Sequence, residues 1–258
     1  GVGAAALATA ISQFVSAVLC RIQLMRTKEE YQLQLKKIKI DSQLLGQIIQ
    51  NGVPSGFQNS VIAIANVFVQ SNINAFGKMA MAGCGSYSKV EGFAFLPVTC
   101  FTMALTTFVS QNLGAKQYDR AKKGAWFGVI CSVVIAELIG FVIYAAAPTF
   151  IAAFNSDPEV VRFGVMQART ISLFYFVLAF SHCVAAVLRG SGHASVPMLV
   201  MLCVWCVFRV SYITVTVHFI PDIRVIFWAY PLTWCISSVI FLYLFLRGKW
   251  VHGFERQK

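Results

Sequence analysis

The chain is poor in charged residues. Only 12% of its 258 residues are charged, Asp and Glu together number 10, and 58% are hydrophobic. An ordinary soluble globular protein carries about 25% charged residues, so the composition excludes that class. The uncharged segments need a nonpolar environment over most of their length.

The motifs of common enzymes are also lacking. The sequence contains no Gly-x-Ser-x-Gly, His-Glu-x-x-His or P-loop pattern, and these are the local signatures of hydrolase and nucleotide chemistry. Its eight cysteines are scattered, apart from the pair Cys203 and Cys206, which lies in an apolar stretch without a second Cys/His pair. Apolar packing is the expected role of such thiols. We predict no catalytic residue, no metal site, no cofactor and no enzymatic activity.

What the chain does have is a series of long apolar stretches. About 20 apolar residues at a rise of 1.5 Å cross the hydrocarbon core, and backbone groups in lipid must be satisfied within their own segment. The sequence therefore predicts an all-α polytopic membrane protein with seven transmembrane helices, at residues 1–20, 43–76, 92–113, 124–150, 163–188, 194–219 and 225–246.

The basic residues gather in alternate gaps between these stretches. Fifteen of the 21 Lys and Arg residues follow the first, third, fifth and last stretch, whereas the other gaps hold only Lys78, Arg162 and Arg224. The positive-inside rule then predicts a cytoplasmic carboxyl terminus and an outside start, in a cell membrane that we expect to be a bacterial inner membrane. This bias accounts for most of the net charge of +11, so membrane lipid is the expected partner and nucleic acid is not.

The longest polar connection predicts a boundary between two bundles. In residues 26–42, Tyr31, Leu35 and Ile38 recur at helical spacing beside lysines, which favours an amphipathic helix at the membrane surface. Residues 1–25 open on small residues suited to close helix packing and have no signal-peptide pattern. We expect them to be the last helix of a truncated amino-terminal bundle, and residues 43–258 to form a carboxyl-terminal bundle of six helices.

Proline and glycine mark further features. Ser156-Asp157-Pro158-Glu159 predicts a helix start outside the membrane. Pro54 and Pro97 permit bends in their helices. The segment 52–56 (Gly-Val-Pro-Ser-Gly) is the strongest candidate for irregular backbone, which membranes tolerate only against protein or a wet cavity.

One predicted helix carries a stripe of amides. Asn59, Asn66, Gln70 and Asn74 are spaced by 7, 4 and 4 residues, so at about 100° per residue they share a narrow face. Such a stripe can line a cavity or bond to a neighbouring helix. Both interpretations stay open.

Charged residues within the apolar stretches are candidates for substrate or ion coupling, because burying them is costly unless they are paired or wetted. Lys89 and Glu91 point about 160° apart on a helix, so Glu91 is expected to face Arg209 or Arg169. Such a pair can exchange a proton or a cation, or it can be a static ion pair that fixes helix register. Tyr212 shares a helix face with Arg209.

Aromatic residues offer a further way to hold a cation, through the faces of their rings. The sequence is 14% aromatic, so most of these residues must pack or anchor the interface. The candidates are Phe174, Tyr175, Phe176, Trp205, Tyr230 and Trp234.

Five motifs in order resemble the multidrug and toxic compound extrusion (MATE) transporters. They are Gly1 to Gln13, Gly52-Val53-Pro54, Glu91 to Pro97, Gln111 to Lys122, and Leu188-Arg189-Gly190-Ser191-Gly192 with Pro197-Met198. Each motif is weakly specific, but together they run from one end of the chain to the other. The resemblance identifies the chain as the sixth helix, the linker and the carboxyl-terminal bundle of that twelve-helix fold.

The resemblance implies export of drugs or other organic cations in exchange for Na⁺ or H⁺, together with the missing amino-terminal half of the same protein. Some sodium-coupled members carry carboxylates where Ile62 and Leu178 stand in this chain, so that cation site does not carry over. A lipid-linked sugar flippase of the same superfamily is the alternative, because Lys89, Arg169 and Arg209 suit a diphosphate. A seven-helix receptor fits less well.

Overall fold

The computed structural model describes residues 2–28, 32–34, 39–247 and 250–251, and this described part contains helices and connections but no strand. It divides into two compact units, residues 1–47 and 48–258. The first unit contains α1 (Val2–Arg26) and the start of α2 (Ser42–Asn74). The predicted all-α fold class is confirmed.

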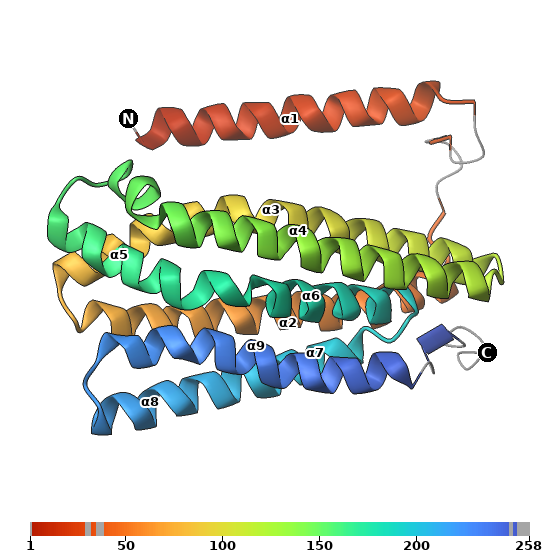
Figure 1. Cartoon of the computed structure of the whole chain (residues 1–258). Helices are drawn as coiled ribbons and strands as arrows, with labels where there is room; N and C mark the ends of the chain where they lie inside the picture. The colour runs from red at the N-terminus through yellow and green to blue at the C-terminus, as the bar shows by residue number, and fades with distance from the viewer. Residues whose placement is uncertain (1, 29–31, 35–38, 248–249, 252–258) are drawn as a thin grey trace. The chain divides into compact units, whose positions relative to one another are not determined.

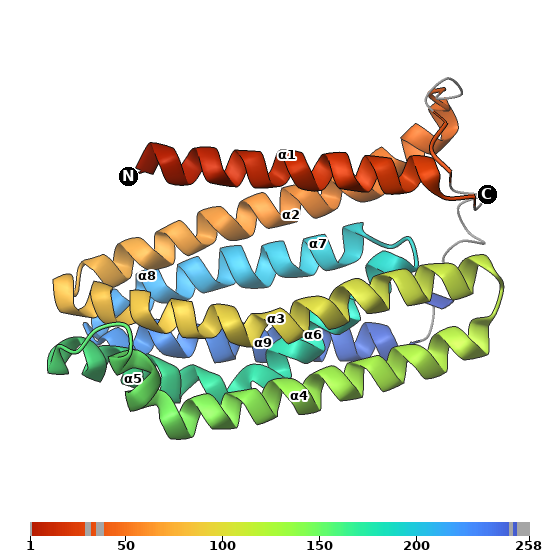
Figure 2. The same ribbon diagram turned by 90° about the horizontal axis from the view of Figure 1, so that it is seen from above.

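The second unit is a bundle of long helices joined by short turns (Figures 1 and 2). Two of its membrane segments are interrupted, the first by the 3₁₀ turn η2 and the second by the π-helical turn η3. After α2 the elements are α3 (Lys78–Gly114), α4 (Tyr118–Ala152), α5 (Pro158–Ile171), η2 (Ser172–Phe174), α6 (Tyr175–Gly190), α7 (Ser195–Met201), η3 (Leu202–Phe208), α8 (Arg209–Phe219) and α9 (Ile223–Leu246).

Six segments of the described chain are long and apolar enough to cross a membrane, which makes this a multi-pass membrane protein. The six are Ala6–Arg26, Lys78–Gly114, Tyr118–Ala152, Pro158–Gly190, Ser195–Phe219 and Ile223–Leu246. The second of the seven predicted spans, residues 43–76, corresponds to α2, which at 33 residues is long enough to cross a membrane. Its many Asn and Gln residues lower its hydropathy. Amides in a membrane helix are tolerated where they face protein or water.

The start of α3 differs from the prediction, since the helix begins at Lys78 and not near residue 92. The added turns contain Gly, Ser and Lys, which hid them from a search for apolar runs. They are helical because their small residues pack closely against α5: a Cβ on Gly83 would lie 2.6 Å from the carbonyl oxygen of Val160. With 37 residues α3 exceeds the thickness of a bilayer core, so it must tilt or protrude.

The predicted amphipathic linker helix is not supported where it is described. Residues 27–28, 32–34 and 39–41 are not helical. Tyr31, Leu35 and Ile38, which carry that pattern, lie outside the described residues. The assignment of 26–42 as the boundary between two bundles stays a prediction.

The helix start predicted at residues 156–159 is confirmed, with Asp157 as its N-cap, and its location outside the membrane stays a prediction. The Asp157 carboxylate accepts hydrogen bonds from the backbone N–H groups of Glu159 at 2.8 Å and Val160 at 3.4 Å, and Pro158 is the first helical residue. A carboxylate at this position satisfies amides that the helix itself leaves unpaired.

The prediction of irregular backbone at residues 52–56 is wrong, because α2 continues through Pro54 as a helix. Proline removes one hydrogen bond, and a long helix absorbs that loss. The regular α-helix is interrupted instead at η2 and η3. At η2 the carbonyl oxygen of Ser172 lies against Gly140 of α4, and a Cβ atom on residue 140 would overlap that oxygen.

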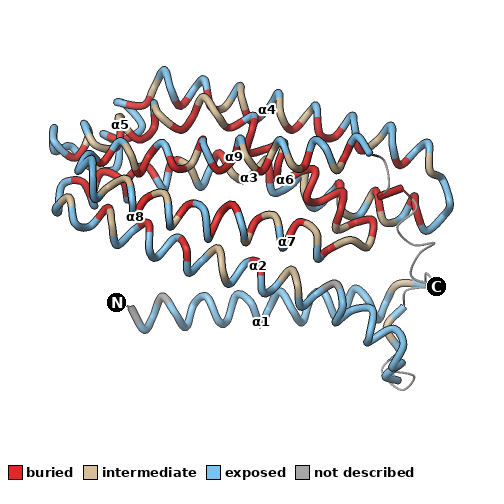
Figure 3. The backbone as a smooth tube through the Cα atoms, turned by 90° about the horizontal axis from the view of Figure 1, so that it is seen from below, coloured by how far each residue is buried: buried red, intermediate tan, exposed pale blue. Residues whose placement is uncertain are grey.

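The bundle is centred on α6, which is buried over most of its length between α3, α4 and α9 (Figure 3). Polar contacts tie both α6 and η3 to α9. Ser181 Oγ lies 3.1 Å from Ser237 Oγ and 2.6 Å from Ser238 Oγ, and Trp205 Nε1 donates to Ser237 at 3.2 Å. Such bonds between helices substitute for the hydrophobic driving force that lipid does not supply.

Candidate functional site

A polar pocket of about 240 Å³ lies within the second unit, among α2, α3, α9 and the η3–α8 segment. We call it the Glu91–Arg209 pocket, after the two charged residues in its lining. Its walls combine those charges with amides and aromatic rings: Ile62, Asn66, Val69, Gln70, Ser88, Glu91, Phe95, Trp205, Arg209, Tyr230 and Trp234.

Arg209 is held on several sides. It is only 2% exposed, and its Nη2 and Nε donate to Thr233 Oγ1 at 2.7 and 3.3 Å. The guanidinium carbon lies 4.9 Å from the ring centroid of Trp205 and 4.7 Å from that of Tyr230. Ring faces and a hydroxyl together compensate for the loss of water around a buried cation. Arg209 is the first residue of α8, directly after η3.

Glu91 ends a hydrogen-bonded chain that enters the bundle from the pocket. Its Oε1 accepts from the Tyr87 hydroxyl at 3.3 Å, and that hydroxyl lies 2.8 Å from the hydroxyl of Tyr175. Both tyrosines are buried, whereas Glu91 is only half-buried and lines the pocket. The chain therefore connects a carboxylate in the pocket with hydroxyl groups in the core.

The geometry leaves the Glu91 carboxylate able to bind. A carboxylate can accept about four hydrogen bonds. Arg209 lines the same pocket, and its Nη2 and Nε atoms donate to Thr233 and not to Glu91. A proton or a small cation can occupy the free positions of a carboxylate in such an environment. No group of three or more His, Cys, Asp or Glu residues within the described segments is arranged to hold a metal ion.

The structure brings together four of the predicted site residues and leaves four elsewhere. Asn66, Gln70, Glu91 and Arg209 line the pocket. From the amide stripe, Asn59 and Asn74 are exposed and do not line it, although Gln70 Nε2 donates to Asn74 Oδ1 at 2.9 Å. Thus the stripe extends past the pocket at both ends.

The other two predicted residues lie against aromatic rings outside the pocket. Arg169 is exposed, with its guanidinium 5.8 Å from the ring centroid of Tyr144. Tyr212 stacks on Phe208, with ring centroids 6.3 Å apart. Of the two arginines that were candidates for a partner of Glu91, only Arg209 shares its pocket.

Sequence reasoning missed Tyr87 and Thr233, which form the hydrogen bonds with Glu91 and Arg209, and it selected Tyr175 only for its aromatic ring. Thr233 lies in an apolar run, where a single hydroxyl group gives no signal. A signal was present for Tyr87, because it precedes Glu91 by four residues on the same helix. Gln58 was also missed: it is buried and its Nε2 lies 2.7 Å from Met201 Sδ.

Ile62 and Leu178 stand at the two positions at which some sodium-coupled MATE transporters carry carboxylates. Ile62 lines the pocket and Leu178 is 1% exposed in the core. Glu91 is the pocket's single carboxylate.

Fold and pocket together define a multi-pass helical membrane protein with a charged site inside its bundle. A family model described as MatE matches residues 54–215, and the chain belongs to that family. The probable multidrug resistance protein NorM of Thermotoga maritima is 27% identical over 97% of this chain and 54% of its own length. The probable multidrug resistance protein YoeA of Bacillus subtilis is 22% identical over 93% of this chain and 53% of its own length.

Solved structures support the same fold. The crystal structure of MATE in complex with MaL6 superposes with a TM-score of 0.87 at 18% identity, over 95% of this chain and 56% of that one. The chain therefore spans about half the length of the curated relatives and structures that it matches.

Proposed function

We propose that this chain is the carboxyl-terminal part of an antiporter that exports drugs or other organic cations in exchange for Na⁺ or H⁺. The Glu91–Arg209 pocket is its contribution to the transport path. One observation carries the proposal: a half-buried carboxylate faces a membrane pocket beside aromatic rings. A carboxylate can bind the coupling ion, and ring faces attract organic cations. The names of the bacterial relatives support drug export.

The position of the cations favours this function over lipid-linked sugar transport. A diphosphate requires several positive charges in one cavity, but Arg209 is the only cation in the pocket lining. The Lys89 ammonium lies 5.3 Å from the ring centroid of Phe154, and Arg169 lies beside Tyr144. Neither of them lines the pocket.

Transport by the full-length gene product in proteoliposomes tests the proposal. With ethidium as substrate, we expect an imposed Na⁺ or H⁺ gradient to drive export, and applying the two gradients separately identifies the coupling ion. The two halves of the transporter are expected to rock against each other around the site. Ethidium movement under neither gradient would contradict drug antiport, and movement of a lipid-linked sugar in its place would support the flippase.

We also propose that the α3–α4 turn and the carboxyl terminus lie in the cytoplasm, because Lys116, Arg120, Lys122 and Lys123 cluster at that turn. A Lys122→Cys variant, with the native cysteines replaced, should react with a membrane-impermeant maleimide in inverted vesicles and not in intact cells. The opposite pattern would reverse the topology.

A further inference from the structure

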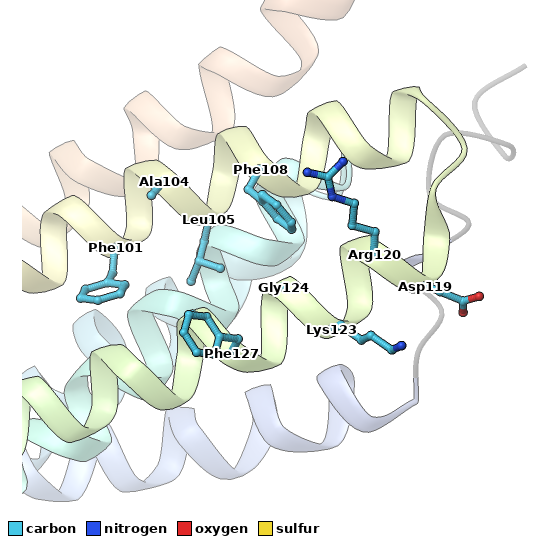
Figure 4. Close-up of a pocket in the computed structure, with 10 residues that line it drawn as sticks. Phe101, Ala104, Leu105, Phe108, Asp119, Arg120, Lys123, Gly124 and Phe127 are labelled. Carbon is cyan, nitrogen blue, oxygen red and sulfur yellow. The ribbon is translucent and has the colours of Figure 1, made fainter.

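A second and larger depression, of about 650 Å³, lies between α3 and α4 near their connecting turn (Figure 4). We call it the α3–α4 groove. Its walls are apolar, from Phe101, Ala104, Leu105 and Phe127, and its end nearest the turn carries Arg120 and Lys123. Phe127 is 71% exposed, so the groove opens on the outer surface of its unit.

The groove follows from the sequence of α4. Gly124 and Gly128 are one helical turn apart, and α3 packs directly on them. A Cβ on Gly124 would overlap the Phe108 ring, and one on Gly128 would lie 2.6 Å from Leu105 Cδ2. The floor of the groove is therefore tightly packed, and the depression results from the close contact of α3 with the two glycines of α4.

The groove is separate from the Glu91–Arg209 pocket. The two share no lining residue. On α3 the pocket uses Ser88, Glu91 and Phe95, whereas the groove uses residues 101–108, which at 100° per residue face a different direction. The transport path proposed above does not account for it.

Charge at one end and apolar walls along the rest define the chemistry of an occupant. Arg120 extends from α4 toward α3 beside Phe108, while Asp119 and the flexible side chain of Lys123 point away from α3 (Figure 4). The Arg120 guanidinium lies 6.0 Å from the Phe108 ring centroid and donates to Gln117 Oε1 at 3.3 Å. Residues 116–123 hold four basic side chains and one acidic one, a balance that attracts an anion and repels an organic cation.

We propose that the α3–α4 groove binds an anionic phospholipid, with its phosphate at Arg120 and Lys123 and an acyl chain along Phe101, Ala104, Leu105 and Phe127. The basic end lies at the ends of two membrane helices, the depth at which headgroups lie. Basic sites between membrane helices at that depth bind anionic headgroups. The elongated apolar part requires a lipid tail, which free phosphate lacks.

Fluorescence quenching tests the proposal, because Trp126 is adjacent to the groove residue Phe127 and is 42% exposed. The full-length gene product is reconstituted in phosphatidylcholine bilayers with a small fraction of phosphatidylglycerol, with bromine on the acyl chains of one lipid or the other. Subtracting the Trp126→Phe signal isolates Trp126. We expect brominated phosphatidylglycerol to quench it more strongly than brominated phosphatidylcholine at equal fraction.

Two charge-matched double variants separate a site from a general surface potential. Arg120→Gln with Lys123→Gln should lower the preference for phosphatidylglycerol by at least about fivefold, the effect of one cation near a membrane surface. Lys116→Asn with Lys122→Gln removes equal charge from the same turn outside the groove, and should leave most of the preference intact. Asparagine replaces Lys116 because the backbone φ angle at this position is 58°, in the left-handed region that asparagine adopts more readily than most residues.

An Ala104→Phe variant, which fills the groove and keeps the charge, should lower quenching by both lipids. Equal quenching by the two lipids in the unchanged protein would overturn the proposal. So would equal losses in the two double variants, which indicate surface charge alone. Absence of quenching by either lipid would show that protein covers the groove, and would overturn it as well.

Discussion

Replacing Glu91 by glutamine is expected to lower gradient-driven efflux by about tenfold to a hundredfold. Glutamine keeps the shape and still accepts the hydrogen bond from Tyr87, which is 3.3 Å away, but it cannot ionise. Hydrogen bonds to charged groups contribute about 1.5–3 kcal/mol, and each 1.4 kcal/mol is tenfold in an equilibrium constant. Initial rates of ethidium efflux in proteoliposomes, under the gradient that drives the unchanged protein, measure the effect.

Glu137 supplies the matched control for this experiment. It is also a carboxylate within a membrane helix, but it accepts the backbone N–H of Phe176 at 3.3 Å and does not line the pocket. Glu137→Gln should retain efflux. A Glu91→Gln protein with full efflux under its driving gradient would exclude Glu91 from coupling, and equal losses in both variants would indicate a general effect on the bundle.

Replacing Arg209 by lysine is expected to destabilise the bundle and to reduce transport, although the charge is retained. The guanidinium donates twice to Thr233 and lies against the rings of Trp205 and Tyr230. An ammonium group cannot reproduce the planar fork or its stacking. We expect a loss of about 1.5–3 kcal/mol, the value of hydrogen bonds to a charged group. Thermal unfolding in detergent measures the loss as a lower midpoint.

Arg169→Lys is the control, because Arg169 is exposed and its guanidinium lies beside the ring of Tyr144. Its midpoint and its transport should stay near those of the unchanged protein. If Arg209→Lys unfolds at the same temperature as Arg169→Lys, the contacts of the guanidinium do not contribute to stability. Normal efflux in an Arg209→Lys protein that unfolds at a lower midpoint would assign the guanidinium a purely structural role.

The sequence predicted the candidate site in part. It selected Glu91 and Arg209 because charges in apolar runs are costly, and it selected Trp205, Tyr230 and Trp234 as aromatic candidates. Helical periodicity also separated Lys89 from Glu91, and the structure places the first beside Phe154 and the second in the pocket. The sequence could not distinguish Arg209 from Arg169 as the partner of Glu91, because local sequence patterns do not show which helices face each other.

Periodicity predicts which residues share a face of a helix, but it does not predict which part of the helix's length a pocket covers. Asn59 and Asn74 lie on the predicted stripe with Asn66 and Gln70, yet the pocket extends over only the middle of that stripe. Tyr212 shares a face with Arg209 but lies one turn further along α8. The interruption at η2 was likewise beyond prediction, because the approach of Ser172 to Gly140 brings together residues that are distant in the sequence.

The amino-acid sequence by itself determined that this is an all-α multi-pass membrane protein. That outcome is local, because each segment in lipid must satisfy its own backbone hydrogen bonds and be apolar over its own length. Only the tertiary structure decided which polar side chains share a pocket and where α3 and α4 leave a groove. Those features depend on the rotation and depth of each helix against its neighbours, which side-chain packing between distant segments fixes.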